Sequence, residues 1–311
     1  MRRGCSIVRY HFIHVRDNTK WSEIKALAIN NFTKQLDFFS KYYAFVTMQD
    51  CISAIYHNTE LPENALLLIF DDGYIDHFIT VFPILKQRRI QGCFFPSAKA
   101  TIDKKLLEIN KLHLILAIVN DTDDLIKQIY NYLDEYRLEY KLKNNEYYAS
   151  CAIEEDRFDS KKVNFIKNLL HRELDCRVSR LIVNRLFSKY VTEDESSLAR
   201  QFYMDRDQIK TMIQAGMYVG SHSYEHFWLP GLSLDLLKKE IDASVDFLKN
   251  LGLAADSWTM NYPFGGYDES IITLVKSKGF KAGLTTRLGV AGLTEENAFT
   301  LESFDTNDFK V

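Results

Sequence analysis

Three short segments of the sequence carry side chains that could do chemistry together, and each lies at the carboxyl end of a predicted strand. The first is Phe70-Asp71-Asp72-Gly73, in which two adjacent carboxylates follow an apolar run. Two carboxylates at a strand end are costly to bury unless something cationic compensates for them. One could bind a metal ion while the other acts as a base toward water. An ordinary Asp-Gly turn with a helix cap explains this segment, taken alone, equally well.

The second segment is His222-Ser223-Tyr224-Glu225-His226, which follows Gly220-Ser221 at the end of another predicted strand. Two histidines at positions i and i+4 are expected to share one face of a helical turn, a spacing that suits one metal ion. The zinc-protease pattern HExxH is excluded, because the residue after His222 is a serine. Two surface histidines at this spacing by chance are the alternative.

The third segment is Asn261-Tyr262-Pro263-Phe264-Gly265-Gly266. A proline followed by an apolar residue and two glycines predicts an irregular strand end with accessible backbone amides. Such amides can stabilise an oxyanion. By itself the segment is also typical of an ordinary turn.

Taken together, the segments are more specific than any one of them. Asp72, His222 and His226 form a set of metal ligands that leaves coordination positions open for water and substrate. Two histidines and one carboxylate also suit non-haem iron oxygenases. The order, with Asp72 before both histidines, and the βαβ pattern around the segments argue against that alternative.

Hydrophobic patterning predicts the elements that position these segments. Continuous apolar runs at 65–70 and 92–95 flank a helical pattern at about 74–88, which indicates a βαβ unit with strands buried on both faces. In open α/β sheets and barrels, active sites lie at the carboxyl ends of the strands. The remaining predicted strands are 6–13, 217–222, 258–264 and 280–285; the helices are 31–43, 207–215, 233–251 and 268–278, with Ser233 and Asp268 as possible N-caps.

The middle of the chain differs in composition. Residues 103–200 contain neither proline nor glycine, and their apolar residues recur at helical spacing over 106–118, 123–140 and 161–190. We therefore predict an all-helical insertion, with its likeliest loop at 143–150. Because the insertion leaves a strand at its carboxyl end, we expect it beside the mouth of the active site.

The composition excludes several classes of protein. The net charge of −3 and the absence of like-charge blocks give no basic footprint for nucleic acid. Five cysteines without a CxxC pair predict neither a disulfide framework nor a cysteine zinc site, and so favour a reducing compartment. No apolar run is long enough to span a membrane, and Arg9, His11 and His14 interrupt the segment after the basic N-terminus. A cytoplasmic location without a membrane span is therefore expected.

The three segments resemble the motifs of the polysaccharide deacetylase family, also called the NodB-homology domain or carbohydrate esterase family 4. The matching stretches are 69–73, 222–226 and 261–265, and the resemblance covers most of 5–100 and 205–311. It implies an α/β fold: a distorted (β/α) barrel of about seven strands. The chain would be a single domain, 1–311, with the helical insertion at about 103–200 between the first two motifs.

The resemblance also implies roles for residues. Asp71 would be the general base, and the Phe264 amide would help to form an oxyanion hole. Asp72, His222 and His226 would hold one divalent metal ion, with zinc expected. The implied reaction removes acetyl groups from N-acetylglucosamine-type sugars, or O-acetyl groups from some glycans, so that the expected partner is an N-acetylated glycan.

The chain departs from the family pattern at three places. Ile69 replaces a threonine, Asn261 replaces an arginine that tethers the base, and 284–286 lacks the late histidine that serves as general acid. Tyr10-His11 resembles the start of the poly-N-acetylglucosamine deacetylase branch, in which an N-terminal histidine is the acid. His11 is therefore predicted as the acid; His14, His113 and a dual role for Asp71 are the alternatives.

Two further interpretations stay open. The missing late histidine would also fit a non-catalytic glycan-binding module on a decayed deacetylase fold. The helical insertion could be a docking platform for a partner protein, which an exposed apolar stripe on 106–118 would favour.

Overall fold

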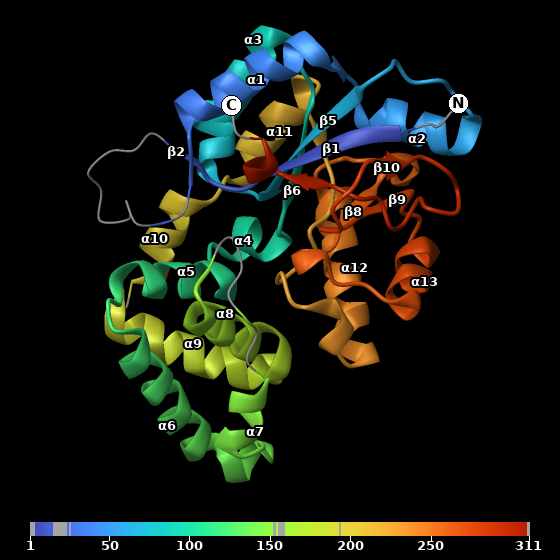
Figure 1. Cartoon of the computed structure of the whole chain (residues 1–311). Coiled ribbons are helices and arrows are strands. Elements are labelled where there is room, and N and C mark those ends of the chain that lie inside the picture. The colour runs from blue at the N-terminus through green and yellow to red at the C-terminus, as the bar shows by residue number, and fades with distance from the viewer. Residues whose placement is uncertain are drawn as a thin grey trace. The chain divides into compact units, whose positions relative to one another are not determined.

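The computed structural model describes residues 4–14, 24, 26–151, 154, 159–192 and 194–309. The chain divides into two compact units (Figure 1). The α/β unit contains the described residues 4–14, 26–105 and 196–309, and the helical unit contains Leu106–Glu195.

Parallel strands form the centre of the α/β unit. β1 (Gly4–Tyr10), β5 (Ala65–Asp72), β6 (Gly92–Pro96) and β7 (Tyr218–Val219) pair in this order. All eight residues of β5 are buried, as expected for a strand covered on both faces. β4 (Ala44–Phe45) pairs with β5, and β10 (Ala291–Gly292) runs antiparallel to β1.

Beyond β7, isolated parallel β-bridges extend the sequence of adjacent strands. Ser221 pairs with Met260 of β8 (Thr259–Asn261), which pairs in turn with β9 (Ala282–Leu284). Leu284 bridges to Leu301, and the chain then enters β11 (Phe304–Asp305), which is parallel to β1. This arrangement agrees with the predicted distorted (β/α) barrel. A short pair, β2 (Ile13–His14) and β3 (Leu27–Ala28), lies apart from it.

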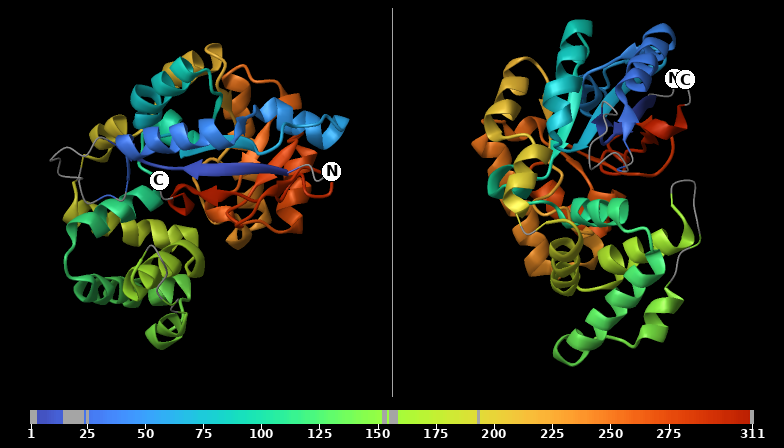
Figure 2. Two further views of the ribbon diagram at one scale, coloured as in Figure 1. Left: turned by 45° about the horizontal axis from the view of Figure 1, so that its top comes forward. Right: turned by 90° about the vertical axis from the view of Figure 1, so that its left-hand side faces the viewer.

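Amphipathic helices cover these strands (Figure 2). They supply apolar side chains such as Phe32, Leu85 and Ile241 to one core with the strands. Ser233 and Asp268 cap their helices as predicted, because their side chains accept hydrogen bonds from the amides of Leu236 and Ile271. These helices are α1 (Ile29–Tyr42), α2 (Met48–His57), α3 (Phe82–Arg88), α4 (Ala98–Asp103), α11 (Arg206–Gln214), α12 (Leu234–Asn250) and α13 (Glu269–Ser277). A further helix, α10 (Glu195–Phe202), contributes none of its described side chains to this core.

The helical unit has buried apolar side chains of its own, among them Ile115, Ile129, Leu133, Ile182 and Leu186, all with no exposed area. Its described residues form helices and no strand. These are α5 (Glu108–Ile118), α6 (Thr122–Tyr140), α7 (Asn145–Ser150), α8 (Lys161–Asn168), the π-helical turn η2 (Leu169–Glu173) and α9 (Cys176–Tyr190).

Three local predictions were wrong. The predicted loop at 143–150 contains α7, because the Asn144 side chain caps it by accepting a hydrogen bond from the Tyr147 amide. The helix predicted over 161–190 is interrupted, since Asp175 starts a new helix by capping α9. The first strand ends at Tyr10, three residues earlier than predicted.

None of the helices in the described part of the chain combines the length and the apolar character that a membrane span requires. The expected position of the helical insertion beside the active-site mouth stays a prediction.

Candidate active site

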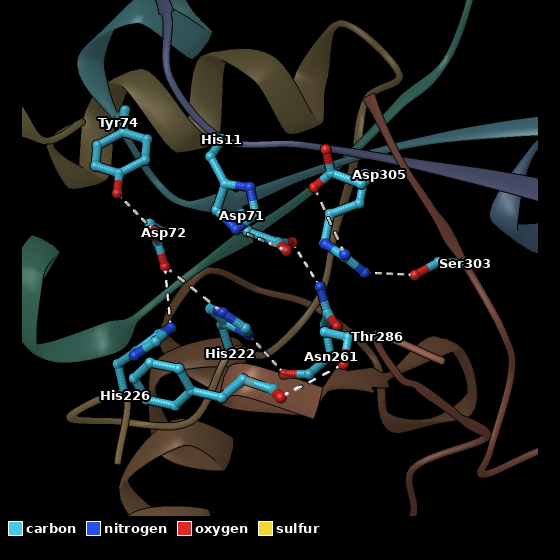
Figure 3. A network of polar contacts seen from close by, with 12 residues as sticks. His11, Asp71, Asp72, Tyr74, His222, His226, Asn261, Thr286, Ser303 and Asp305 are labelled. Atoms are coloured by element: carbon cyan, nitrogen blue, oxygen red, sulfur yellow. Dashed lines mark hydrogen bonds and ion pairs between the residues drawn. The ribbon is translucent and has the colours of Figure 1, made fainter. Parts of the chain in front are cut away.

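The chemistry-bearing side chains meet at the carboxyl ends of the parallel strands (Figure 3). Asp71 and Asp72 end β5, and His11 follows β1. His222 and His226 lie in the segment after β7, and Asn261 ends β8. These residues come from distant parts of the sequence, and the strand order makes them neighbours.

Asp72, His222 and His226 converge on one point. Each offers a ligand atom, and these atoms lie within 4.8 Å of one another. The Nε2 atoms of His222 and His226 are 3.5 and 3.3 Å from Oδ1 of Asp72. All three residues are at most 9% exposed.

The tautomer of His222 is set by its backbone partner. Its Nδ1 lies 2.6 Å from the carbonyl oxygen of Asn261, which can only accept, so Nδ1 carries the hydrogen. Burial lowers the pKa of His222 to about 3, opposed by the charge of Asp72. The ring is therefore neutral, and its Nε2 lone pair faces Asp72. A histidine that donates its other N–H to a carbonyl is typical of metal ligands.

Asp72 has the complementary arrangement. Its Oδ2 accepts a hydrogen bond of 2.6 Å from the Tyr74 hydroxyl, whereas its Oδ1 is buried and accepts none from the described residues. Burial alone would raise the pKa of Asp72, but nearby imidazoles, led by His226, lower it to about 2. An ionised oxygen facing two ring nitrogens without a hydrogen bond fits a cation among the three groups.

The backbone that carries these groups is not helical, so the predicted helical turn for the histidine pair was wrong. Ser223 and His226 have left-handed φ angles of 57° and 61°, and Asp72 has a φ of 70°. Left-handed conformations of non-glycine residues cost on the order of 1–3 kcal/mol each and gather at functional sites. In this loop the two turns, rather than the i, i+4 spacing of a helix, bring both rings to Asp72.

Asp71 lies beside the ligand set and is only 2% exposed. Its Oδ1 accepts a hydrogen bond of 2.5 Å from the Asn261 amide, and its Oδ2 is 3.8 Å from Nε2 of His11. Burial raises its pKa well above the usual range, while Arg9 acts in the opposite direction. Asn261 therefore holds Asp71 from the position at which the family resemblance leads us to expect an arginine.

His11, the predicted acid, has a ring nitrogen near the Asp71 carboxylate. Its side chain is 45% exposed, although desolvation by its surroundings lowers its pKa. The rival His14 instead faces Asp76 at 3.8 Å, and His113 belongs to α5 of the helical unit.

The third segment forms a tight turn next to the ligand set. Phe264 has a left-handed φ of 55°, and its ring centroid lies 4.7 Å from that of His226. The following Gly265 has no room for a side chain, because a Cβ there would lie 2.2 Å from Oγ1 of Thr286. Thr286, at the position of the expected late histidine, hydrogen-bonds the Phe264 carbonyl oxygen at 3.5 Å.

Two residues that act on the aspartates of the site were not predicted from the sequence. Tyr74 holds Asp72, and its place directly after Asp72-Gly73 was an available signal. Arg9 donates a hydrogen bond of 2.6 Å to Ser303 and lies 3.7 Å from Asp305, and its charge acts on Asp71. No sequence pattern pointed to Arg9, because its partners lie about 300 residues away.

Part of the chain is similar to known polysaccharide deacetylases. Residues 178–283 match the family model described as polysaccharide deacetylase. A putative polysaccharide deacetylase of Bacillus subtilis, YxkH, is 27% identical over 95 residues, which are 30% of this chain and 34% of that protein. The chain thus spans about a third of the length of the curated relatives it matches.

Solved structures share the fold over nearly the whole chain. The Streptococcus pyogenes deacetylase PplD, determined in complex with acetate, has a TM-score of 0.60 at 17% identity and covers 98% of this chain and 93% of its own. A de-N-acetylase from Aggregatibacter actinomycetemcomitans has a TM-score of 0.52 at 15% identity, covering 97% and 95%.

Proposed function

Because residues 178–283 match the polysaccharide deacetylase model and solved deacetylases share the fold, we propose that this chain is a metal-dependent hydrolase that removes acetyl groups from N-acetylated sugars of a glycan. The observation that carries the proposal is the convergence of Asp72, His222 and His226 within 4.8 Å, with Asp71 beside them. Three protein ligands with open positions are the donor set of a catalytic zinc site, and zinc is the ion we propose. Such an ion would polarise the acetyl carbonyl as a Lewis acid.

The chain's own residues supply the remaining steps. Asp71 takes a proton from the attacking water as its oxygen bonds to the acetyl carbon. The backbone N–H of Phe264 donates to the oxyanion that develops on the carbonyl oxygen. His11 then gives a proton to the sugar nitrogen as the carbon–nitrogen bond breaks, which leaves acetate and a free amine.

A histidine suits the last step. An amine leaves poorly unless it is protonated, and an imidazole, whose ordinary pKa is about 6.5, gains and loses a proton close to neutral pH. Desolvation lowers the pKa of His11 below that value, so its protonated ring gives up the proton more readily than a free imidazolium. His11 lies beside Asp71 and keeps an exposed edge toward solvent. A relative of the same fold is a de-N-acetylase, which favours nitrogen over oxygen as the atom that carries the acetyl group.

The test measures acetate release from a panel of N-acetylated glycans and nucleotide-linked sugars, with and without a chelator. Metal content is measured in parallel in His222→Ala and His226→Ala, with His14→Ala as the control histidine. We expect chelator-sensitive acetate release, and metal lost from the first two variants only. A full equivalent of metal in both ligand variants would refute the site.

The glycan-binding alternative has one observation in its favour, the threonine at position 286 where the family has its late acid. It predicts glycan binding with no acetate release from any member of the panel. Acetate release excludes it.

A further inference from the structure

The loop of Ser223, Tyr224, Glu225 and His226 needs support from outside itself. Two of its residues have left-handed φ angles, and such conformations persist only where the surroundings hold them. Within the loop, Ser221 Oγ accepts from the Ser223 amide and Ser223 Oγ accepts from the His226 amide, each at 3.2 Å. These bonds tighten the turns but do not attach the loop to the rest of the unit.

Glu240 makes that attachment from α12. It is 2% exposed, and its Oε2 accepts hydrogen bonds from the amides of Tyr224 at 3.2 Å and Glu225 at 2.8 Å. Among the described residues, both hydrogen bonds of this carboxylate come from the loop. A buried carboxylate is costly unless it is hydrogen-bonded, so the loop amides are what compensate for its burial.

α4 holds the other side of the same residues. The amides of Ala98 and Lys99 donate to the carbonyl oxygens of Ser223 and Tyr224 at 3.2 and 3.0 Å. The ammonium group of Lys99 pairs with the Glu225 carboxylate, and both side chains are mostly buried. The N–H groups of Tyr224 and Glu225 are therefore bonded by α12, and the carbonyl groups of Ser223 and Tyr224 by α4.

We propose that Glu240, assisted by the Lys99–Glu225 pair, is a positioning residue that shapes this loop so that the His226 ring faces Asp72. The inference rests on the proposed metal site. The hydrogen bonds of Glu240 go to backbone amides of the loop, so it acts through the backbone that carries His226. Groups that orient metal ligands typically contribute about 10–100-fold to metal affinity.

The experiment measures the zinc dissociation constant of the full chain by competition with a chromophoric chelator. Glu240→Ala is expected to weaken zinc binding by about 10-fold or more. Glu240→Gln keeps an oxygen that accepts both amides, so its affinity should stay within a few-fold of the wild type. Val245→Ala is the matched control, because it truncates a buried apolar side chain on the same helix. It should lower thermal stability without changing zinc affinity.

Wild-type zinc affinity in Glu240→Ala would overturn the proposal, and so would an equal loss in the Gln and Ala variants. If Glu240→Ala does not fold, Lys99→Met decides, since it removes the ion pair but keeps an unbranched apolar side chain at this mostly buried position. It should weaken zinc binding by a smaller factor, and unchanged affinity overturns the proposal. Retention of zinc by His222→Ala would instead show that the metal site is wrong.

Discussion

At the scale of single residues, the surroundings of two adjacent aspartates shift their pKa values in opposite directions. Asp72 faces imidazoles and the Tyr74 hydroxyl, and its pKa falls to about 2. Asp71 is equally buried, and burial raises its pKa, although Arg9 and Asn261 oppose this. Such divergence between neighbouring carboxyls supports the proposed division of roles between them, with Asp72 as a metal ligand and Asp71 as the base.

Asp71→Asn should therefore retain the metal and lose turnover by a factor of about 10²–10⁴, because an amide cannot accept the proton from water. Acetate release and zinc content are measured on the same preparation. Asp76→Asn, which changes a carboxylate that faces His14, is the control and should retain turnover. Near-normal turnover in Asp71→Asn would reject Asp71 as the base.

His11→Ala should leave zinc binding intact and lower turnover on N-acetyl substrates by about 10² or more. The reason is specific to the leaving group, so the loss should shrink on an aryl acetate, whose phenolate departs without a proton. The ratio of the two rates is the measurement, with His14→Ala as the control. An equal loss on both substrates would show that His11 is not the acid.

The sequence allowed the proposed ligands to be selected, because Asp72, His222 and His226 follow predicted strands whose carboxyl ends meet at one edge. It did not reveal what holds them. In the sequence, Glu240 is one of several charged residues on an amphipathic helix. Its burial against the loop results from tertiary packing, which the sequence pattern does not show.

At the scale of elements, apolar runs predicted the buried strands well and helix ends poorly. β5 and β6 lie where 65–70 and 92–95 were expected, because strands buried on both faces must be continuously apolar. The interruption between α8 and α9 was missed, since helical periodicity continues through the π-helical turn η2. A single capping residue, Asp175, decides where the second helix begins.

Glu240 on α12 should make the stability of the protein depend on pH. Burial raises the pKa of Glu240 from 4.5 to about 7, while the two loop amides lower it and the facing charges of Glu225 and Lys99 act in opposite senses. Because the folded-state pKa is raised, the protonated carboxyl favours the folded state. The contribution of Glu240 to the free energy of unfolding should thus be fully present below about pH 4.5 and lost as the pH rises through 7.

The measurement is urea unfolding of the metal-free wild type and of Glu240→Gln at pH 5 and pH 8. Glutamine does not titrate, so between these pH values stability should shift in favour of the variant by roughly 2–3 kcal/mol. Any constant effect of the substitution cancels in this comparison. A wild type and variant that respond identically to pH would contradict the raised pKa.

At the scale of the whole molecule, the chain is two units with separate sets of buried side chains. The core of the α/β unit includes none of the described residues between Ala98 and Met204. The composition of 103–200, without glycine or proline, indicated where the helical insertion lies in the sequence. Its position relative to the active site depends on tertiary contacts that periodicity does not encode, and it stays a prediction.

This division predicts how metal changes unfolding. The proposed ligands all belong to the α/β unit, so zinc should stabilise that unit and leave the helical unit unaffected. At a zinc concentration 100 times the dissociation constant, the gain is about 2.7 kcal/mol. For a unit of roughly 200 residues, this raises the unfolding temperature by about 5–10 °C. Calorimetry with zinc and with chelator should show one transition that moves and one that does not.

Two variants assign the transitions. Leu133→Ala removes a fully buried side chain of α6 and should lower only the transition that zinc leaves in place, by about 2–5 kcal/mol in stability. His222→Ala should abolish the zinc-induced shift and leave the helical transition where it was. A zinc-induced shift in the transition that Leu133→Ala lowers would contradict the separation, because ligand binding stabilises only the part of the molecule whose unfolding destroys the site.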